Sequence, residues 1–152
     1  MKNIVIRSDA DIVPGKSIGG VSLGDSVSDV IRCIKSEFTI KKYDISNLVV
    51  KLFLYKINDG TISFTSDKYG IIIALWCEPP YSGSYKNKLY PEITASKLNE
   101  VSKKQEIIKG YLVIDKDFHV YYGMPEDIDD FDCFSDLNDD VIFNKLYVGD
   151  LG

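Results

Sequence analysis

The fold of this chain is decided by residues 48–77, which read LVVKLFLYKINDGTISFTSDKYGIIIALWC. Runs rich in β-branched and aromatic residues predict strands over 48–57, 61–66 and 71–77. The Asn58-Asp59-Gly60 triplet joins the first two strands as a hairpin, and a turn leads into the third. Because the third run is apolar on both faces, we expect it to be a central strand. The stretch therefore predicts an antiparallel meander.

Two helices are predicted on either side of this meander. Apolar residues at helical spacing after Ser26 indicate an amphipathic helix over 27–37. Leu98 and Val101 mark a second helix that begins after Thr94 and runs to about Gln105. Further strands are predicted over 3–7, 108–114, 118–122 and 141–148. We therefore expect an α+β fold, with antiparallel β-sheet meanders and two packed helices, in a single domain that spans residues 1–152.

The order of elements leaves an internal repeat open. SVSDV at 26–30 corresponds loosely to KLNEV at 97–101, and each segment opens a helix before a meander. In that alignment only Val30 and Val101 are identical. One interpretation is a weak α-β-β-β duplication, and the other is an α+β architecture without a repeat.

Charge is distributed unevenly along the chain, although the net charge is only −5. Residues 1–114 contain sixteen basic and twelve acidic residues, whereas residues 115–152 contain two basic and eleven acidic ones. The two parts therefore carry +4 and −9. Eight acids and no base lie between Glu126 and Asp140. This asymmetry argues against nucleic acid or an anionic membrane as the partner of the C-terminal part.

Cysteine and histidine chemistry has little support in the sequence. Cys33, Cys77 and Cys133 are widely spaced and form no zinc or redox motif, which fits reduced thiols in a cytoplasmic protein. His119 is the one histidine and lies in a predicted strand without a partner motif. We therefore expect no catalytic residues, no cofactor and no metal, and predict that the protein is not an enzyme.

Two binding-site patterns also fail. Residues 10–17 resemble a loose phosphate-binding loop, but Ala10 replaces the first glycine and poor helix formers follow Ser17. A calcium loop that begins at Asp127 would place Phe131 at its fifth position and Asn138 at its twelfth, where oxygen ligands and glutamate are required.

The acidic segment is better interpreted as a protein-binding surface. Carboxylates alternate there with apolar side chains, so the surface would steer a basic partner and then hold it by aromatic contacts. The competing interpretation is a solvated acidic loop whose aromatic residues belong to the core. The candidate residues are Glu126, Asp127, Asp129, Asp130, Phe131, Asp132, Phe134, Asp136, Asp139 and Asp140.

Several further motifs resemble those of a known group of proteins. They are IVPGKSIGGVSLG at 12–24, the NDG hairpin, GYLVID at 110–115 and VYYGMP at 120–125. Together they resemble small bacterial immunity proteins of contact-dependent growth inhibition and related polymorphic toxin systems. The resemblance implies binding to the C-terminal domain of a cognate toxin, commonly a nuclease, without catalysis or a cofactor. Toxin-contacting residues vary too much in such proteins to be carried over.

Other function classes stay open. A small-ligand-binding or regulatory domain would use the glycine-rich loop and the tyrosines Tyr81, Tyr85 and Tyr90. A hydrolase would use a carboxylate pair such as Asp127 and Asp130. The sequence does not decide the oligomeric state, the toxin or its activity.

Overall fold

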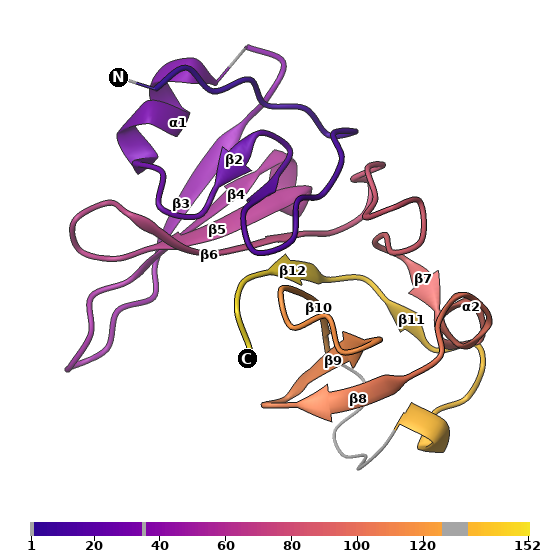
Figure 1. The fold of residues 1–152 in the computed structure, drawn as a ribbon. Helices are drawn as coiled ribbons and strands as arrows, with labels where there is room; N and C mark the ends of the chain where they lie inside the picture. The colour runs from indigo at the N-terminus through magenta and orange to yellow at the C-terminus, as the bar shows by residue number, and fades with distance from the viewer. Residues whose placement is uncertain (1, 35, 126–133) are drawn as a thin grey trace.

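The computed structural model describes residues 2–34, 36–125 and 134–152, without the side chain of Asp136. Its α-helices are α1 (Val27–Cys33) and α2 (Ala95–Val101), and neither is long enough to span a membrane. Two 3₁₀ turns, η1 (Asn58–Gly60) and η2 (Phe134–Asp136), complete the helical part. The described residues thus form a mostly β structure with two short helices (Figure 1).

Eight strands of the described chain form the main sheet. They are β3 (Ile40–Asp44), β4 (Phe53–Ile57), β5 (Ile62–Ser66), β6 (Ile72–Cys77), β8 (Gln105–Ile108), β9 (Tyr111–Ile114), β10 (Val120–Gly123) and β12 (Leu146–Val148). Two small sheets pair β1 (Ser17–Ile18) with β2 (Val21–Ser22), and β7 (Ile93–Thr94) with β11 (Ile142–Phe143).

All neighbours in the main sheet are antiparallel, in the order β3-β4-β5-β6-β12-β10-β9-β8. The predicted α+β fold with antiparallel meanders is therefore confirmed. The NDG triplet joins β4 to β5, and β6 lies in the middle of the sheet, as its apolar sequence predicts.

The core is organised as rows of side chains that cross the sheet. Strand registers place six fully buried residues opposite one another on one face, since directly opposed residues of antiparallel strands point to the same side. This row joins both halves of the sheet through the β6–β12 pair. It runs through Ile57, Ile62, Cys77, Leu146, Tyr122 and Leu112.

The two halves of the sheet share one topology. In each half a short helix is followed by strands that run from an outer edge of the sheet to its centre, where β6 meets β12. Figure 1 shows α1 beside the half formed by β3–β6 and α2 beside the other. The arrangement agrees with an internal repeat, with four strands of the main sheet after each helix.

The register of that repeat differs from the alignment suggested by the sequence. The helices begin after Ser26 and Thr94, and their fully buried residues are Val30 and Leu98. Val30 therefore corresponds to Leu98 and not to Val101. The difference arises because burial on the helix face, and not residue identity, fixes which positions are equivalent.

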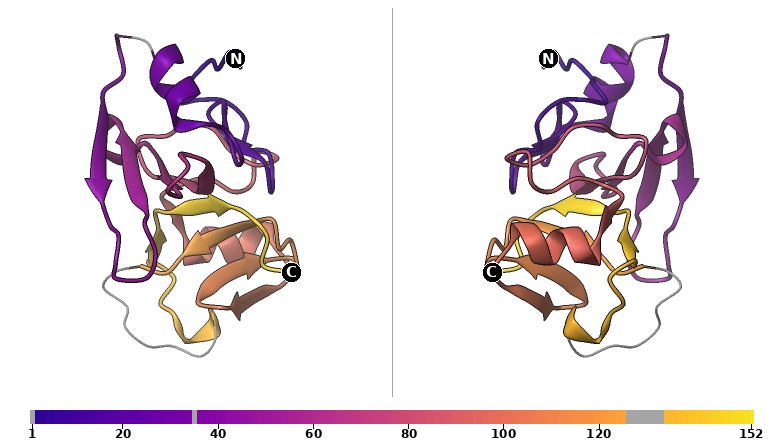
Figure 2. Two further views of the ribbon diagram at one scale, coloured as in Figure 1. Left: turned by 90° about the vertical axis from the view of Figure 1, so that its left-hand side faces the viewer. Right: turned by 90° about the vertical axis from the view of Figure 1, so that its right-hand side faces the viewer.

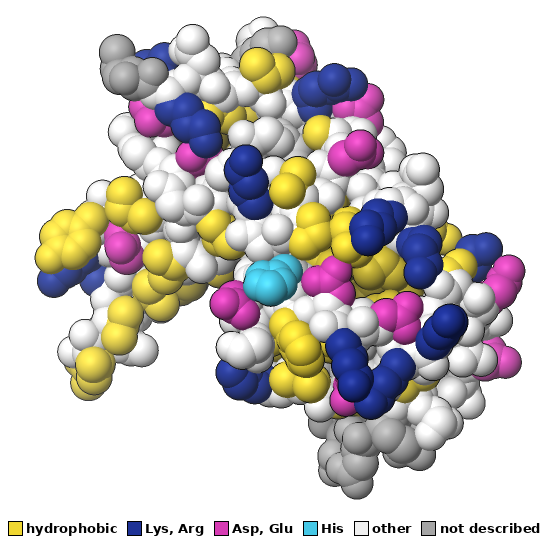
Figure 3. Space-filling view, in the orientation of Figure 1, with side chains coloured by type: hydrophobic (Ala, Val, Ile, Leu, Met, Phe, Trp, Pro, Cys, Tyr) yellow, Lys and Arg dark blue, Asp and Glu magenta, His cyan; other side chains and the backbone are white. Residues whose placement is uncertain are grey.

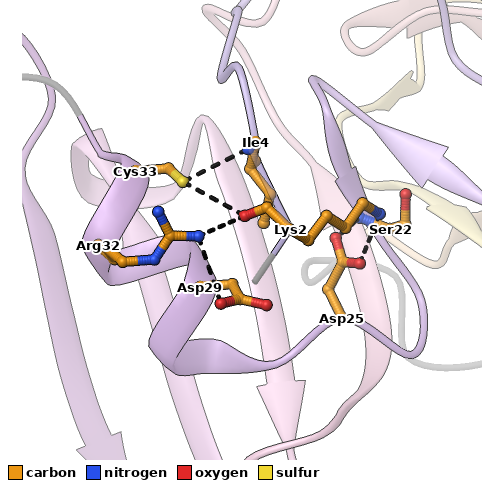
Figure 4. A network of polar contacts seen from close by, with 7 residues as sticks. All are labelled: Lys2, Ile4, Ser22, Asp25, Asp29, Arg32 and Cys33. Carbon is orange, nitrogen blue, oxygen red and sulfur yellow. Dashed lines mark hydrogen bonds and ion pairs between the residues drawn. The ribbon is translucent and has the colours of Figure 1, made fainter.

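The N-terminal segment corrects another prediction, because residues 3–7 do not form a strand. Ile4 and Ile6 are buried, but side chains of α1 bind part of the backbone. The Ile4 amide donates to Cys33 Sγ at 3.4 Å, and the Arg32 guanidinium donates to the Lys2 carbonyl (Figure 4). The alternating apolar residues here are buried between α1 and residues 19–20 without forming a sheet ladder.

Element boundaries supply the remaining corrections. The first helix ends at Cys33 and the second at Val101. The predicted strand over 48–57 begins only at Phe53, and the one over 108–114 begins only at Tyr111, because Ile108 ends β8. The predicted strand over 141–148 is broken into β11 and β12, which belong to different sheets. The edge strands β3 and β8 were not expected, because both are short and lack a simple apolar alternation.

Candidate protein-binding surface

Only the C-terminal end of the acidic segment belongs to the described structure. Glu126, Asp127, Asp129, Asp130, Phe131 and Asp132 lie outside the described residues, and Asp136 is described only as part of η2. Asp139 and Asp140 are exposed. Their backbone is tied to α2, since the Ser96 amide donates to the Asp139 carbonyl at 3.0 Å and the Ala95 amide donates to Val141 at 2.8 Å. These bonds fix the backbone of residues 139–141 beside the start of the helix.

Phe134 is placed by packing against the core. Its side chain is half-buried, and its ring stacks on that of Phe143 with the centroids 6.4 Å apart. Phe143 is fully buried, and Leu137 also packs against the core. In this conformation, the half-buried ring of Phe134 offers only part of its surface to a partner.

A cavity of about 730 Å³ adjoins this end of the acidic segment. Met124, Pro125, Val141 and Ile142 supply its apolar lining. Its polar lining comes from the residue that follows β6, from the segment before β11 and from the segment before β12. These residues are Glu78, Asn138, Asp140, Asn144 and Lys145. Two carboxylates, two amides and one ammonium group therefore line one hollow, next to Asp139 in the sequence.

A second surface was not expected from the sequence. The hairpin of β3 and β4 projects from the body as an arm that ends in apolar side chains (Figures 1 and 3). Leu48 is fully exposed and Val49 is 91% exposed. The turn is nevertheless well formed, since Asn47 Oδ1 accepts hydrogen bonds from the amides of Val49 and Val50 at 2.8 and 2.7 Å. The signal was the turn-forming pair Ser46-Asn47, which places the apolar run at a loop tip.

The glycine-rich loop and the tyrosine-bearing loop, both considered for a small ligand, pack on each other. The backbone of residues 8–12 bonds that of residues 82–84, and the hydroxyl of buried Tyr81 donates to the Ala10 carbonyl. Tyr85 donates to Asp117 Oδ2 at 2.8 Å. Tyr81 and Tyr85 therefore attach the connection between β6 and β7 to the N-terminal segment and to the turn after β9. Ser17 opens strand β1, so no helix follows the phosphate-loop-like stretch directly.

The nucleophilic and basic groups of the described chain lie apart. Burial raises the pKa of the Cys77 thiol far above its ordinary value, and that thiol donates to the Leu146 carbonyl. His119 lies on the surface, with Nε2 3.8 Å from Asp150 Oδ1 (Figure 3). Among the described residues, no group of three histidine, cysteine or acidic side chains is arranged to hold a metal ion.

Comparison with known proteins finds no matching family model, no similar curated protein and no similar solved structure. The resemblance to immunity proteins accordingly rests on the motifs in the sequence.

Proposed function

We propose that this chain is an immunity protein, which binds a cognate toxin domain and neutralises it in the cytoplasm of the producing cell. The toxin domain is basic, as nucleases are, and the immunity protein acts by binding alone. The observation that carries the proposal is the cavity at the end of the acidic segment, where carboxylates outnumber the ammonium group of Lys145 by two to one. Glu78 and Asp140 line this cavity, and exposed Asp139 lies beside it.

The chemistry of this region suits a basic protein. A lysine or arginine side chain of the partner would enter the cavity, where carboxylates accept its hydrogen bonds and the apolar lining packs against its methylenes. The charge of −9 over residues 115–152 would act at longer range. Such a field raises association rates by roughly 10- to 1,000-fold and is screened by salt.

Growth rescue tests the function directly. The chain is co-expressed with candidate toxin C-terminal domains, beginning with the one encoded next to its gene. We expect rescue with the cognate domain and none with unrelated toxin domains. Failure to rescue cells from any neighbouring toxin domain would sink the immunity proposal.

Association kinetics then test the surface. We expect Asp139→Asn with Asp140→Asn to slow toxin association by roughly three- to tenfold at low salt and less at high salt. Replacing Asp129, Asp130 and Asp132 with asparagine should likewise slow association at low salt and have a smaller effect at high salt. The matched control is Glu37→Gln with Glu100→Gln, which removes two exposed carboxylates elsewhere. Equal effects of the control and the test variants would remove the acidic surface from the interface.

A small-ligand-binding function is the second candidate, and the size of the cavity favours it. Volumes of about 300–1,000 Å³ are usual for small-molecule sites, and mixed apolar and polar linings hold such ligands. The chain purified from cells would then carry a ligand visible by native mass spectrometry. Ile142→Trp, at the cavity lining, should expel this ligand, whereas the immunity proposal expects the same change to impair growth rescue.

A further inference from the structure

The edge strand β3 offers an unpaired side of the main sheet. It is the first strand in the sheet order and pairs only with β4. Its residues from Lys41 to Asp44 are exposed. Figure 2 shows this part of the chain, in purple, along the outer edge of the molecule. An open edge of this kind pairs readily with a further strand.

The hydrogen bonds of the β3–β4 hairpin determine which residues face that open side. The Asn58 amide donates to the Thr39 carbonyl at 2.9 Å, and the Ile45 amide donates to the Leu52 carbonyl at 3.1 Å. Because bonded and non-bonded pairs alternate along antiparallel strands, Lys41 and Tyr43 also bond toward β4. The backbone groups of Lys42 and Asp44 consequently point away from the sheet.

We propose that a second copy of this chain occupies this edge, with the two β3 strands antiparallel about a two-fold axis at Tyr43. This register sets Lys42 of each copy opposite Asp44 of the other, so two charge pairs form within bonded pairs of residues. An axis at Lys42 would place two lysines opposite each other instead. Charge complementarity therefore selects Tyr43 as the centre of an isologous contact.

The side chains along β3 fit this arrangement. Tyr43 is 44% exposed and would stand opposite its symmetry mate as a non-hydrogen-bonded pair, in which side chains lie closest. Lysines on edge strands ordinarily discourage pairing. Here Lys41 Nζ is held 2.9 Å from Asp59 Oδ1, and Lys42 Nζ lies 4.4 Å from the centroid of the Phe53 ring. The Lys41 ammonium thus has an acidic partner on its own chain, and the Lys42 ammonium would gain Asp44 of the other copy as its acidic partner.

The same register gives the exposed apolar tip of the arm a place to pack. Beyond Tyr43 the arm of one copy extends past the start of β3 in the other copy. Leu48 then comes level with Phe38, which is only partly buried in the single chain. Burial of these side chains would supply apolar stabilisation that the charge pairs alone lack.

A charge-swap cycle on the full-length chain tests the proposal by sedimentation equilibrium. We expect a concentration-dependent dimer, which Lys42→Asp or Asp44→Lys alone weakens about tenfold, since each places two like-charge pairs at the interface. The double variant should restore the affinity. Lys68→Asp, an exposed change of the same charge outside β3, is the control. A chain that stays monomeric up to about 1 mM, or a dimer unaffected by both single reversals, would overturn the proposal.

Disulfide trapping tests the register independently. In a Cys33→Ser, Cys133→Ser background, Tyr43→Cys places one cysteine of each copy opposite the other. Their Cα atoms would be about 4.5–5.5 Å apart, a separation that disulfides allow. Lys41→Cys places its thiol opposite Ile45 and should not link the copies. Equal linking of both variants, or linking of Lys41→Cys alone, would contradict the register. Both experiments use the chain without a toxin, so their outcome is separate from that of the proposed function.

Discussion

The hydroxyl group of Tyr122 both donates to the carbonyl of Tyr90 and accepts from the amide of Tyr90, at 3.0 Å in each case. Tyr122 lies on β10 in the row of buried residues that crosses the sheet, and its side chain is fully buried. Tyr90 belongs to the long connection between β6 and β7. One buried hydroxyl therefore attaches this connection to the core and satisfies two backbone groups.

We expect Tyr122→Phe to lower the free energy of unfolding by about 1–3 kcal/mol. The substitution keeps the ring but leaves the Tyr90 amide and carbonyl without this partner, and a buried unsatisfied group costs its desolvation energy. Urea unfolding would measure the change. Tyr69→Phe removes a hydroxyl from a side chain that is 76% exposed and should leave the midpoint unchanged. Equal stability of the two variants would show that the Tyr122–Tyr90 bonds add nothing to stability.

Stability should also fall at alkaline pH. Burial raises the pKa of Tyr122 well above its ordinary value of 10.0, and burial likewise raises the pKa of Tyr121. Above pH 10 the unfolded chain releases these phenolic protons while the folded chain retains them, so the unfolded state binds fewer protons and stability falls with rising pH. Below pH 10 the contribution is fully present.

Tyr122 contributes a measurable part of this fall in the free energy of unfolding with pH. Each retained proton contributes about 1.4 kcal/mol per pH unit between the two pKa values. The Tyr122→Phe variant should consequently lose stability less steeply between pH 10 and 11 than the unaltered chain. Parallel curves from urea unfolding across this range would be evidence against the raised pKa.

Two glycines with the same backbone geometry should respond differently to alanine. Gly20 and Gly24 have φ values of +89° and +87°. A Cβ at Gly20 would lie 1.9 Å from the Val5 carbonyl oxygen, whereas a Cβ at Gly24 meets nothing within 4 Å. Gly24→Ala should cost about 1–2 kcal/mol from left-handed strain alone. Gly20→Ala should cost several kcal/mol more, because the N-terminal segment must move. Similar thermal unfolding temperatures for both variants would refute this close approach.

The parts of the fold that could be predicted from the sequence are those fixed by local rules. The NDG turn, and the run that is apolar on both faces and forms β6, each specify their structure within a few residues. The start of α2 is equally local, since Thr94 Oγ1 accepts a hydrogen bond from the Lys97 amide. By contrast, Ser26 makes no such bond to α1, and its hydroxyl lies 2.6 Å from that of Ser28.

The parts that were missed depend on tertiary packing. Strand β3 reads IKKYD, and only its pairing with β4 makes it a strand. The apolar run at residues 48–50 resembles the start of a strand, but it forms the tip of an arm without core contacts in the single chain. Sequence alone also could not reveal the cavity, because its lining comes from segments far apart in the chain, such as Glu78 after β6 and Asp140 before β11.

The role of Phe134 distinguishes a core residue from a partner anchor. Since its half-buried ring stacks on Phe143, Phe134→Ala should lower the free energy of unfolding by about 1–2 kcal/mol. Val49→Ala, which shortens a side chain that is 91% exposed, should leave it unchanged. Urea midpoints at constant m-value would report the difference. If Phe134→Ala kept full stability but weakened toxin binding, the ring would be an anchor, as its place in the acidic segment first suggested. A loss of stability with unchanged association rates would assign it to the core.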